Sequence, residues 1–299
     1  MGNAEKSVET RNGPLLMILS CFFFSLMAVG VKYSLTTLPF YEVVFFRCAI
    51  SAVIFGIMLK RRQNSFRGFN EKALVVRSLA GFAAILCNFY AIANIPLGDA
   101  SLLVNSSPLF VVILSAIFLK EKISRPLLFL ILLSAFGIML VLRPSFHWLN
   151  LASLSGLASG LAAGFFAAVA FVTIHELHET ESSLTIAFYF TTIASLGSLP
   201  LMLPHFRLPV GPERWFILLS GLFGTVGQLL MTKAYRYEQA SRISSLITVS
   251  VIFAFGWGLF LFHEKPTVLS LVGSLVTIIA LALIINLRRE PVTLRSLGS

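Results

Sequence analysis

The sequence has little charge, few cysteines and no glycine-rich phosphate loop. Only 12% of its 299 residues are charged, against about a quarter in an ordinary soluble domain. This scarcity excludes a cytosolic enzyme and a disordered chain. The three cysteines, Cys21, Cys48 and Cys87, lie in apolar stretches and predict neither a disulfide framework nor a zinc site. Without a phosphate loop, the chain cannot by itself drive a pump by nucleotide hydrolysis.

Hydrophobic residues make up 57% of the chain, and the mean hydropathy is +0.88. Ten apolar runs have close to the roughly 20 residues that a helix needs to cross a bilayer. The runs are continuous rather than alternating, which predicts helices and not a barrel. We therefore expect an all-α integral membrane protein with ten transmembrane helices. The runs cover residues 14–32, 41–59, 78–95, 100–119, 126–142, 151–174, 184–203, 215–235, 243–262 and 267–287.

The net charge of +10 indicates orientation in the membrane. Most of the 23 basic residues lie between the runs on the side that also holds the N-terminus, and six of them lie between Lys60 and Arg77. The positive-inside rule then predicts a multi-pass protein of the cell (inner) membrane with both termini in the cytoplasm. Because the charge is spread over loops on one membrane face, the expected partner is the lipid bilayer and not a nucleic acid.

The chain matches itself when shifted by 143 residues. Gly81 falls on Gly224, and Glu121–Lys122 falls on Glu264–Lys265. Each copy holds five runs, an odd number, so the second copy must enter the membrane in the opposite sense. Inverted repeats recur in secondary transporters, whose halves rock around a shared mid-membrane site. The expected domains are two five-helix repeats, 13–143 and 151–287, flanked by cytoplasmic tails, 1–12 and 288–299.

Each repeat carries an apolar helix that ends in a Glu followed by a Lys. These stretches are "LFVVILSAIFLKEK" after Pro108 and "FAFGWGLFLFHEKP" in the second half. Together with "EVVFFR" in the second run and the turn "NIPLGDAS", they resemble the EamA-type unit of the drug/metabolite transporter superfamily over nearly all of residues 13–287. The resemblance implies ten helices, cytoplasmic termini, a central cavity and alternating access. The second half departs from the first at Val251, which stands where the first half has Pro108.

Arg47 is the basic residue that lies well inside a predicted run, because Lys32 and Lys233 fall at the ends of theirs. A guanidinium at that depth is costly unless it faces a water-filled cavity or a partner. Its planar fork suits a carboxylate, so we expect Arg47 to bind the substrate. The alternatives are that it reaches outward to the lipid headgroups or pairs with Glu42. The family resemblance, which implies an arginine at this position, favours the substrate.

Other polar and aromatic residues inside the runs are candidate substrate contacts. We expect contacts from Asn88, Asn105, Tyr90, Tyr189, Gln228 and Trp257. Helix packing or lipid contact is the alternative for each. Asn105 precedes Pro108, whose ring frees a backbone carbonyl and makes a polar notch. No Asp or Glu lies near the middle of a run, which favours uniport or exchange over proton coupling and disfavours a permanently cationic substrate.

No catalytic residue, metal ligand or cofactor is predicted. The segment "HELHE" (175–179) lacks the His-Glu-x-x-His spacing of a zinc enzyme and indicates a solvated loop. We expect a secondary carrier, not an enzyme, that moves a small organic metabolite across the membrane. The sequence leaves the oligomeric state open and is compatible with a monomer.

The substrate stays open. "LLMILSCFFFSLMAVGVKYSL", followed by "EVVFFR", most resembles superfamily branches associated with riboflavin or S-adenosylmethionine uptake. Amino-acid and drug exporters share the scaffold, so an amino-acid-like metabolite is a further candidate. The sulfonium of S-adenosylmethionine fits poorly with the missing buried carboxylate, although an aromatic cage could hold it. The alternative of another class is a membrane-embedded enzyme acting on lipid-linked substrates, for which only "HELHE" offers chemistry.

Overall fold

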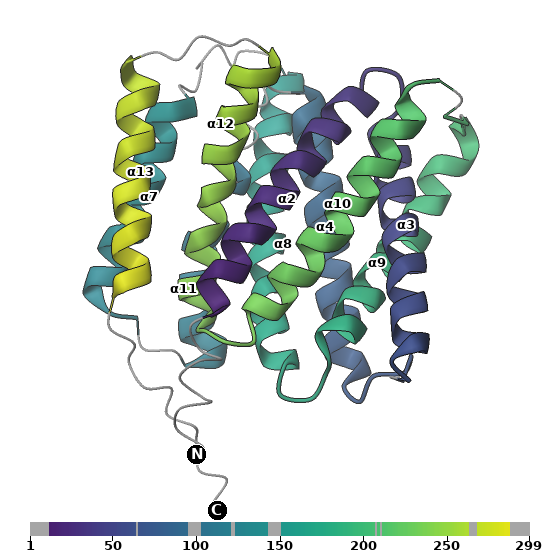
Figure 1. The fold of residues 1–299 in the computed structure, drawn as a ribbon, viewed down its shortest axis with the longest axis horizontal. Coiled ribbons are helices and arrows are strands. Elements are labelled where there is room, and N and C mark those ends of the chain that lie inside the picture. Colours follow the sequence, from purple (N-terminus) through teal and green to yellow (C-terminus); the bar gives the residue numbers. More distant parts are fainter. Residues whose placement is uncertain are drawn as a thin grey trace, which may run out of the picture.

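The computed structural model is a bundle of helices, and the residues it describes contain no strand (Figure 1). It describes residues 12–63, 65–94, 103–120, 123–142, 151–206, 208–209, 211–262 and 268–287. The expected tails apart from Asn12, most of the turn "NIPLGDAS" and both Glu–Lys pairs lie outside these residues. Within the described part, the expectation of an all-α protein is confirmed.

The helices follow the predicted apolar runs closely. The first half contains α2 (Asn12–Ser34), α3 (Phe40–Arg61), α4 (Glu71–Asn94), α6 (Ser107–Leu114), the π-helical turn η1 (Ser115–Leu119) and α7 (Arg125–Leu142). The second half contains α8 (Leu151–Leu177), α9 (Ser183–Met202), the short 3-10 turn η2 (Leu203–His205), α10 (Glu213–Ala234), α11 (Ala240–Ser245), the 3-10 turn η3 (Leu246–Thr248), α12 (Val249–Phe262) and α13 (Val268–Asn286).

Six helices of the described chain are long and apolar enough to cross a membrane, namely α2, α3, α4, α8, α9 and α10. Shorter apolar helices cover Ser107–Leu119, Arg125–Gly137 and Leu275–Ile284. Large apolar side chains such as Phe118 and Phe129 are 71% and 64% exposed, which fits contact with lipid and not with water. The chain is a membrane protein, and its described residues confirm six of the ten expected spans by length and hydropathy.

The fourth expected helix of each half is interrupted. In the first half, Asn105 and Ser106 form a turn before α6, and the Ser106 hydroxyl donates a hydrogen bond to the Leu103 carbonyl at 2.5 Å. In the second half, η3 separates α11 from α12, and Thr248, which ends η3, is the repeat counterpart of Asn105. Both halves therefore break the same helix at the same position, where the sequence predicts only the notch before Pro108.

Helices that are equivalent under the 143-residue shift pack in equivalent ways. α2 packs against α10, and its counterpart α8 packs against α4, which is the counterpart of α10. α3 packs against α9, and α7 against α13, so each of these pairs joins one helix to its own repeat counterpart. Figure 1 shows α7 and α13 side by side at one edge of the bundle. The packing is therefore related by an approximate two-fold axis between the repeats.

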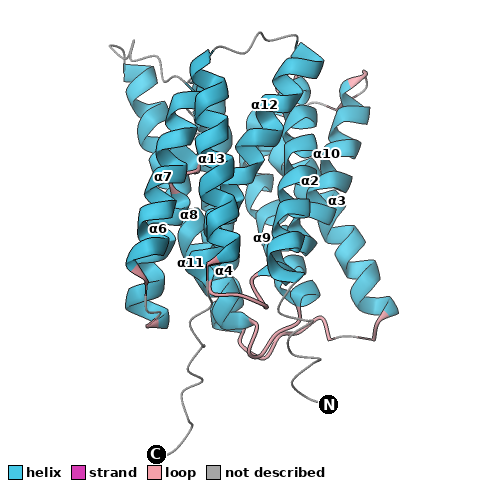
Figure 2. Ribbon diagram, turned by 60° about the vertical axis from the view of Figure 1, so that its left-hand side comes forward, coloured by secondary structure: helices cyan, strands magenta, loops and turns pink. Residues whose placement is uncertain are grey.

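Equivalent helices also run in opposite senses. The start of α2 lies beside the end of α10, since a methyl group built on Gly13 would be 3.6 Å from the Ala234 carbonyl oxygen. The end of α8 lies there too, since His175 Nδ1 is 3.0 Å from the Tyr235 carbonyl oxygen. The loops at this end lie close together (Figure 2). The α3–α4 connection contacts the α8–α9 turn there, since the Asn70 amide donates to Glu181 at 2.7 Å. α2 thus begins where α8 finishes.

Gly137 marks a close approach of α7 to α13. A methyl group built there would lie 2.8 Å from the Gly273 carbonyl oxygen and 2.9 Å from the Thr277 amide nitrogen. We expect Gly137→Ala to lower the free energy of unfolding by about 1–3 kcal/mol, because backbone atoms must move apart. In the matched control Gly256→Ala, nothing lies within 4 Å of the added methyl group. Melting temperatures in detergent check this, and equal values for the two variants would contradict the close packing.

Candidate functional site

A cavity of about 210 Å³ lies between the two halves of the bundle. α2, α3 and α4 line it from the first half, and α8, α9 and α10 from the second, together with both interrupted helices. Most of its lining is apolar or aromatic, as in typical small-molecule sites. The lining residues are Met17, Cys21, Phe24, Met27, Arg47, Arg77, Gly81, Ala84, Ile85, Asn88, Phe89, Val104, Ala163, Ala167, Ala170, Phe171, Phe190, Gln228, Met231, Ile247 and Ser250.

Many of these residues are repeat counterparts of one another. Six pairs are separated by the repeat length: Phe24 and Ala167, Met27 and Ala170, Arg47 and Phe190, Ile85 and Gln228, Asn88 and Met231, and Val104 and Ile247. Equivalent positions from both repeats therefore face one cavity, which places it on the approximate two-fold axis. In half of these pairs, a charged or amide side chain in one repeat corresponds to an apolar side chain in the other. The cavity is thus nearly symmetric in its backbone and asymmetric in its side chains.

Arg47 lies on α3 and is 6% exposed. Its guanidinium packs against α10, since a methyl group built on Gly224 would lie 2.9 Å from Arg47 Nε. Nε has no hydrogen-bond partner, and Arg47 forms no ion pair within the described residues. Arg47 and Glu42 therefore do not form the structural pair that the sequence left as an alternative. Arg47 is a buried cation that faces the cavity, and the described residues supply no counter-charge for it.

Arg77 is a second buried cation. The prediction that it lies in a loop before the third apolar run is wrong. α4 begins at Glu71, so Arg77 lies in its second turn and is 2% exposed. Its guanidinium carbon is 4.1 Å from the centre of the Phe190 ring. Arg47 is therefore not the only arginine inside a span. A helix-start signal marks the true beginning of α4, because the Asn70 side chain caps it by accepting a hydrogen bond from the Ala73 amide at 3.2 Å.

Two of the expected amide contacts line the same cavity. Asn88 lies on α4, and Gln228 on α10 donates from Nε2 to the Thr232 hydroxyl at 3.2 Å. Their repeat counterparts are Met231 and Ile85, so each repeat contributes one amide at a position where the other is apolar. The structure thus brings Arg47, Asn88 and Gln228 together around one space.

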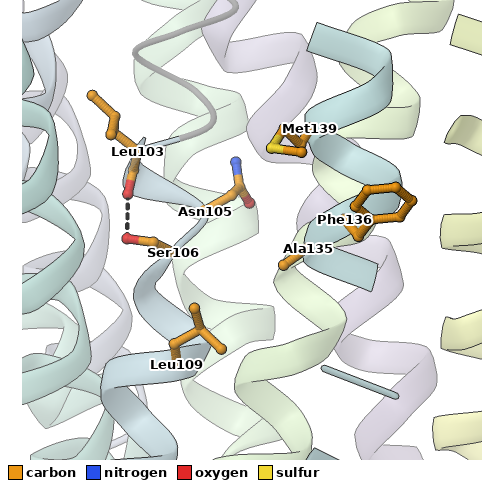
Figure 3. Close-up of a pocket in the computed structure, with 7 residues that line it drawn as sticks. All are labelled: Leu103, Asn105, Ser106, Leu109, Ala135, Phe136 and Met139. Atoms are coloured by element: carbon orange, nitrogen blue, oxygen red, sulfur yellow. Dashed lines mark hydrogen bonds between the residues drawn. The ribbon is translucent and has the colours of Figure 1, made fainter. Parts of the chain in front are cut away.

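Asn105 lines a different pocket, shown in Figure 3. This hollow of about 280 Å³ lies between the start of α6 and α7 and is lined by Leu103, Asn105, Ser106, Leu109, Ala135, Phe136 and Met139. It contains no charged side chain, and Phe136 is 50% exposed beside it. We therefore take the central cavity as the candidate site. Val104, next to Asn105, faces that cavity from the same break in the helix.

The three expected aromatic contacts do not line the central cavity. Trp257 on α12 donates from its indole to the Ser25 hydroxyl at 2.9 Å, which joins α12 to α2. The Tyr189 hydroxyl accepts a hydrogen bond from the Gly68 amide at 3.3 Å, near the end of the bundle. Tyr90 is 36% exposed, and its hydroxyl is 3.3 Å from that of Ser155. Each of these side chains therefore has a packing partner away from the cavity.

The "HELHE" segment is not the solvated loop that the sequence predicts. His175 Nδ1 is 3.0 Å from the Tyr235 carbonyl oxygen, and His178 Nε2 is 2.5 Å from that of Thr232. Both imidazoles can donate to carbonyls at the end of α10, which lack partners within that helix. The described residues contain no group of three His, Cys, Asp or Glu that could hold a metal ion. The two histidines anchor the end of α8 to the end of α10.

Burial lowers the pKa of His178 from its ordinary value of 6.5 to about 4. Between these two pH values the unfolded chain binds more protons than the folded chain. The contribution of neutral, buried His178 to the free energy of unfolding is therefore fully present above pH 6.5 and is lost as the pH falls toward 4. We expect the free energy of unfolding to fall by on the order of 1–2 kcal/mol between pH 7 and pH 5. His178→Gln keeps an N–H donor without titrating. A wild-type melting temperature that follows that variant over this range would contradict the assignment.

Comparison with known proteins identifies the fold and its repeats. A model of the EamA-like transporter family matches residues 11–143 and 154–286. Pseudopaline exporter CntI of Pseudomonas aeruginosa (strain UCBPP-PA14) is 34% identical over 272 residues, covering 90% of this chain and 94% of that protein. Solute carrier family 35 member G1 of Homo sapiens is 28% identical, covering 89% of this chain and 76% of that protein. One solved crystal structure has a TM-score of 0.76 at 15% identity, covering 91% of this chain and 95% of that chain.

The two family matches are offset by the same 143 residues that relate the lining pairs of the cavity. The family and the two named relatives are transporters, not enzymes. This chain therefore belongs to the EamA-like transporter family and contains two EamA repeats.

Proposed function

We propose that this protein is a secondary carrier that exports a small organic metabolite across the cell membrane by alternating access. The observation that carries the proposal is the central cavity, which lies between the two repeats and holds Arg47 without a counter-charge from the described residues. In carriers built from inverted repeats, the substrate site lies at the repeat interface, and the halves rock around it.

Ten transmembrane helices in two inverted five-helix repeats fit this mechanism. The opposite senses of α2 and α8 support the inversion, and the equivalent breaks before α6 and before α12 support the fourth span of each repeat. Interrupted helices are tolerated at membrane depth where they line a cavity, as Val104 and Ile247 do here. The basic segment 60–72 favours an inner-membrane orientation with both termini in the cytoplasm.

At the site, Arg47 binds an anionic group of the solute, while Asn88 and Gln228 hydrogen-bond its other polar atoms. A guanidinium and two amides supply donors for oxygen atoms, and the surrounding Phe and Met side chains accept apolar parts. Substrate contacts from the other four candidates stay predictions, because none of the four lines the central cavity. These four are Asn105, Tyr90, Tyr189 and Trp257.

Export is favoured over uptake because a relative that is 34% identical is by name an exporter. Neither riboflavin nor S-adenosylmethionine appears in the names of the relatives given above. The positive sulfonium of S-adenosylmethionine would face arginine with no carboxylate among the described lining residues, which argues against it. An amino-acid-like or drug-like metabolite with an acidic group fits the cavity better. The missing carboxylate also supports uniport or exchange over a proton relay.

Transport by the purified full-length protein in proteoliposomes tests the proposal. Vesicles loaded with a small-metabolite extract, and matched vesicles without protein, are diluted into buffer, and the released solutes are followed by mass spectrometry. A carrier should release few solutes, with a rate that saturates with internal concentration and rises when the same solute is present outside. Release that never saturates would indicate a channel, and new products would indicate an enzyme. Release equal to that of empty vesicles would overturn the proposal.

A further inference from the structure

The central cavity contains two buried guanidiniums, from Arg47 and Arg77. They are 6% and 2% exposed, respectively. No Asp or Glu is among the described lining residues, and neither arginine forms an ion pair in the described chain. Nε of both arginines and Nη1 of Arg77 are buried and have no hydrogen-bond partner. The cavity therefore has an excess of positive charge that this part of the protein does not neutralise.

We propose that the transported solute is an organic dianion, such as a dicarboxylate, with one negative charge bound by Arg47 and the other by Arg77. This inference rests on the proposed carrier function and names its substrate class. A buried cation without a counter-charge is strongly unfavourable, and two like charges in one cavity also repel each other. A dianion neutralises both, and each planar guanidinium can bind a carboxylate through two parallel hydrogen bonds.

Arg242 provides a contrast within the same chain. It is 7% exposed and lies 3.7 Å from the carboxylate of Glu238, one turn earlier. Buried charges in proteins are normally paired in this way unless they serve a ligand. Within the described part of the chain, the cavity arginines have no such carboxylate partner, although their burial is similar. A purely structural role therefore does not explain them.

Neighbouring residues hold both cavity arginines in place without neutralising them. Arg77 lies over the Phe190 ring, and this cation–π contact offsets only part of the cost of burying a charge. A methyl group built on Gly81 would lie 2.8 Å from Arg77 Nη1 and 2.9 Å from the Phe190 ring. Gly224, the repeat counterpart of Gly81, leaves the same kind of room for Arg47. The two glycines thus make space for two guanidiniums beside the cavity.

Both cations come from the first repeat, so the positive charge lies on one side of the cavity. The repeat counterpart of Arg47 is Phe190, and that of Arg77 is Ser220. α3 and α4 therefore supply the positive wall, while α2 and α8 contribute Phe24 and Phe171. We infer that the solute binds in one orientation, with its dianionic part toward α3 and α4 and a less polar part toward the aromatic side chains.

Ligand-dependent melting of the full-length protein in detergent tests the charge class directly. The probes are diacids and their monoamides, which differ by one charge: succinate and succinamate, N-acetylglutamate and N-acetylglutamine, and N-benzoylglutamate and N-benzoylglutamine. We expect at least one diacid to raise the melting temperature at a concentration about tenfold lower than its monoamide. Arg77→Gln should remove this preference, and the exposed control Arg61→Gln should keep it. Equal effects of every diacid and its monoamide, or a preference unchanged in Arg77→Gln, would overturn the proposal.

The ligand-free variants separate this role from a structural one. Arg77→Gln should melt at or above the wild-type temperature, because it removes a buried charge that the described residues do not neutralise. If both Arg77→Gln and Arg77→Lys failed to fold, Arg77 would be structural and the proposal would fall. Transport is scored separately in proteoliposomes. Selective release of only cations or zwitterions would leave the carrier function standing and refute the dianion. No selective release would refute the carrier function, while melting would still decide the charge class.

Discussion

Arg47→Gln is expected to slow solute export from proteoliposomes about 30- to 100-fold while the protein still folds. A hydrogen bond to a charged group contributes about 1.5–3 kcal/mol, and a bidentate arginine contact lies at the upper end of that range. Arg47 is suited to such a contact because it is 6% exposed, lines the cavity and has no ion-pair partner among the described residues. Glutamine keeps a polar side chain of similar length but loses the charge.

Two companion variants make this result specific. Arg47→Lys keeps the charge and loses the planar fork, so its export rate should lie between those of the wild type and Arg47→Gln. Arg61→Gln makes the same chemical change at the exposed end of α3 and should transport normally. The export rate, measured at equal protein incorporation and with melting curves recorded in parallel, checks the series. Normal export by Arg47→Gln would remove Arg47 from the site.

The repeat could be predicted from the sequence because a duplication leaves one fixed spacing. Gly81 and Gly224 match under the shift of 143 residues, and in the structure both leave room for an arginine side chain. The helical class follows as directly, because apolar runs of this length have few other folds in a membrane. The breaks near Asn105 and Thr248 are harder to predict, since only the first repeat carries a proline there.

The side of the helix that faces the cavity could not be predicted, because lipid and protein interior are both apolar to a helix in a membrane. Tyr189 and Phe190 are neighbours on α9, yet Phe190 lines the cavity and Tyr189 contacts Gly68 at the end of the bundle. The same ambiguity applies to Val104 and Asn105, since Val104 lines the central cavity and Asn105 lines the other pocket. Only a contact between helices distant in sequence, such as that of Arg77 with Phe190, distinguishes these positions.

The burial of Arg77 was not predicted for a different reason, because hydropathy alone defined the start of the helix. The apolar run begins at Ser78, so hydropathy alone leaves Arg77 outside it. The helix begins one to two turns earlier, where Asn70 caps it, and Arg77 is therefore carried into the bundle. Capping signals locate a helix start where hydropathy does not, because a charged residue can enter the span when it faces a cavity.

A disulfide between Ser51→Cys and Thr225→Cys is expected to lower the export rate about tenfold or more, because it joins α3 of the first repeat to α10 of the second. The Thr225 hydroxyl donates to that of Ser51 at 2.8 Å, so the two side chains already point at each other inside the bundle. Serine and threonine differ little from cysteine in size. The bond should therefore form under mild oxidation without displacing either helix.

Reversibility distinguishes blocked motion from damage to the site. Export by the double variant should return when the disulfide is reduced, and each single cysteine variant should export normally under both conditions. The single variants also report whether Cys48, one turn from Ser51 on α3, pairs with a new thiol. The seam between α3 and α10 lies beside Arg47, since Gly221 and Gly224 of α10 contact Ile50 and Arg47 of α3. If the halves rock around the cavity, this seam must shift in every cycle. Unchanged export by fully cross-linked protein would mean that α3 and α10 move as one body. The boundary between the two moving parts would then lie between other helices.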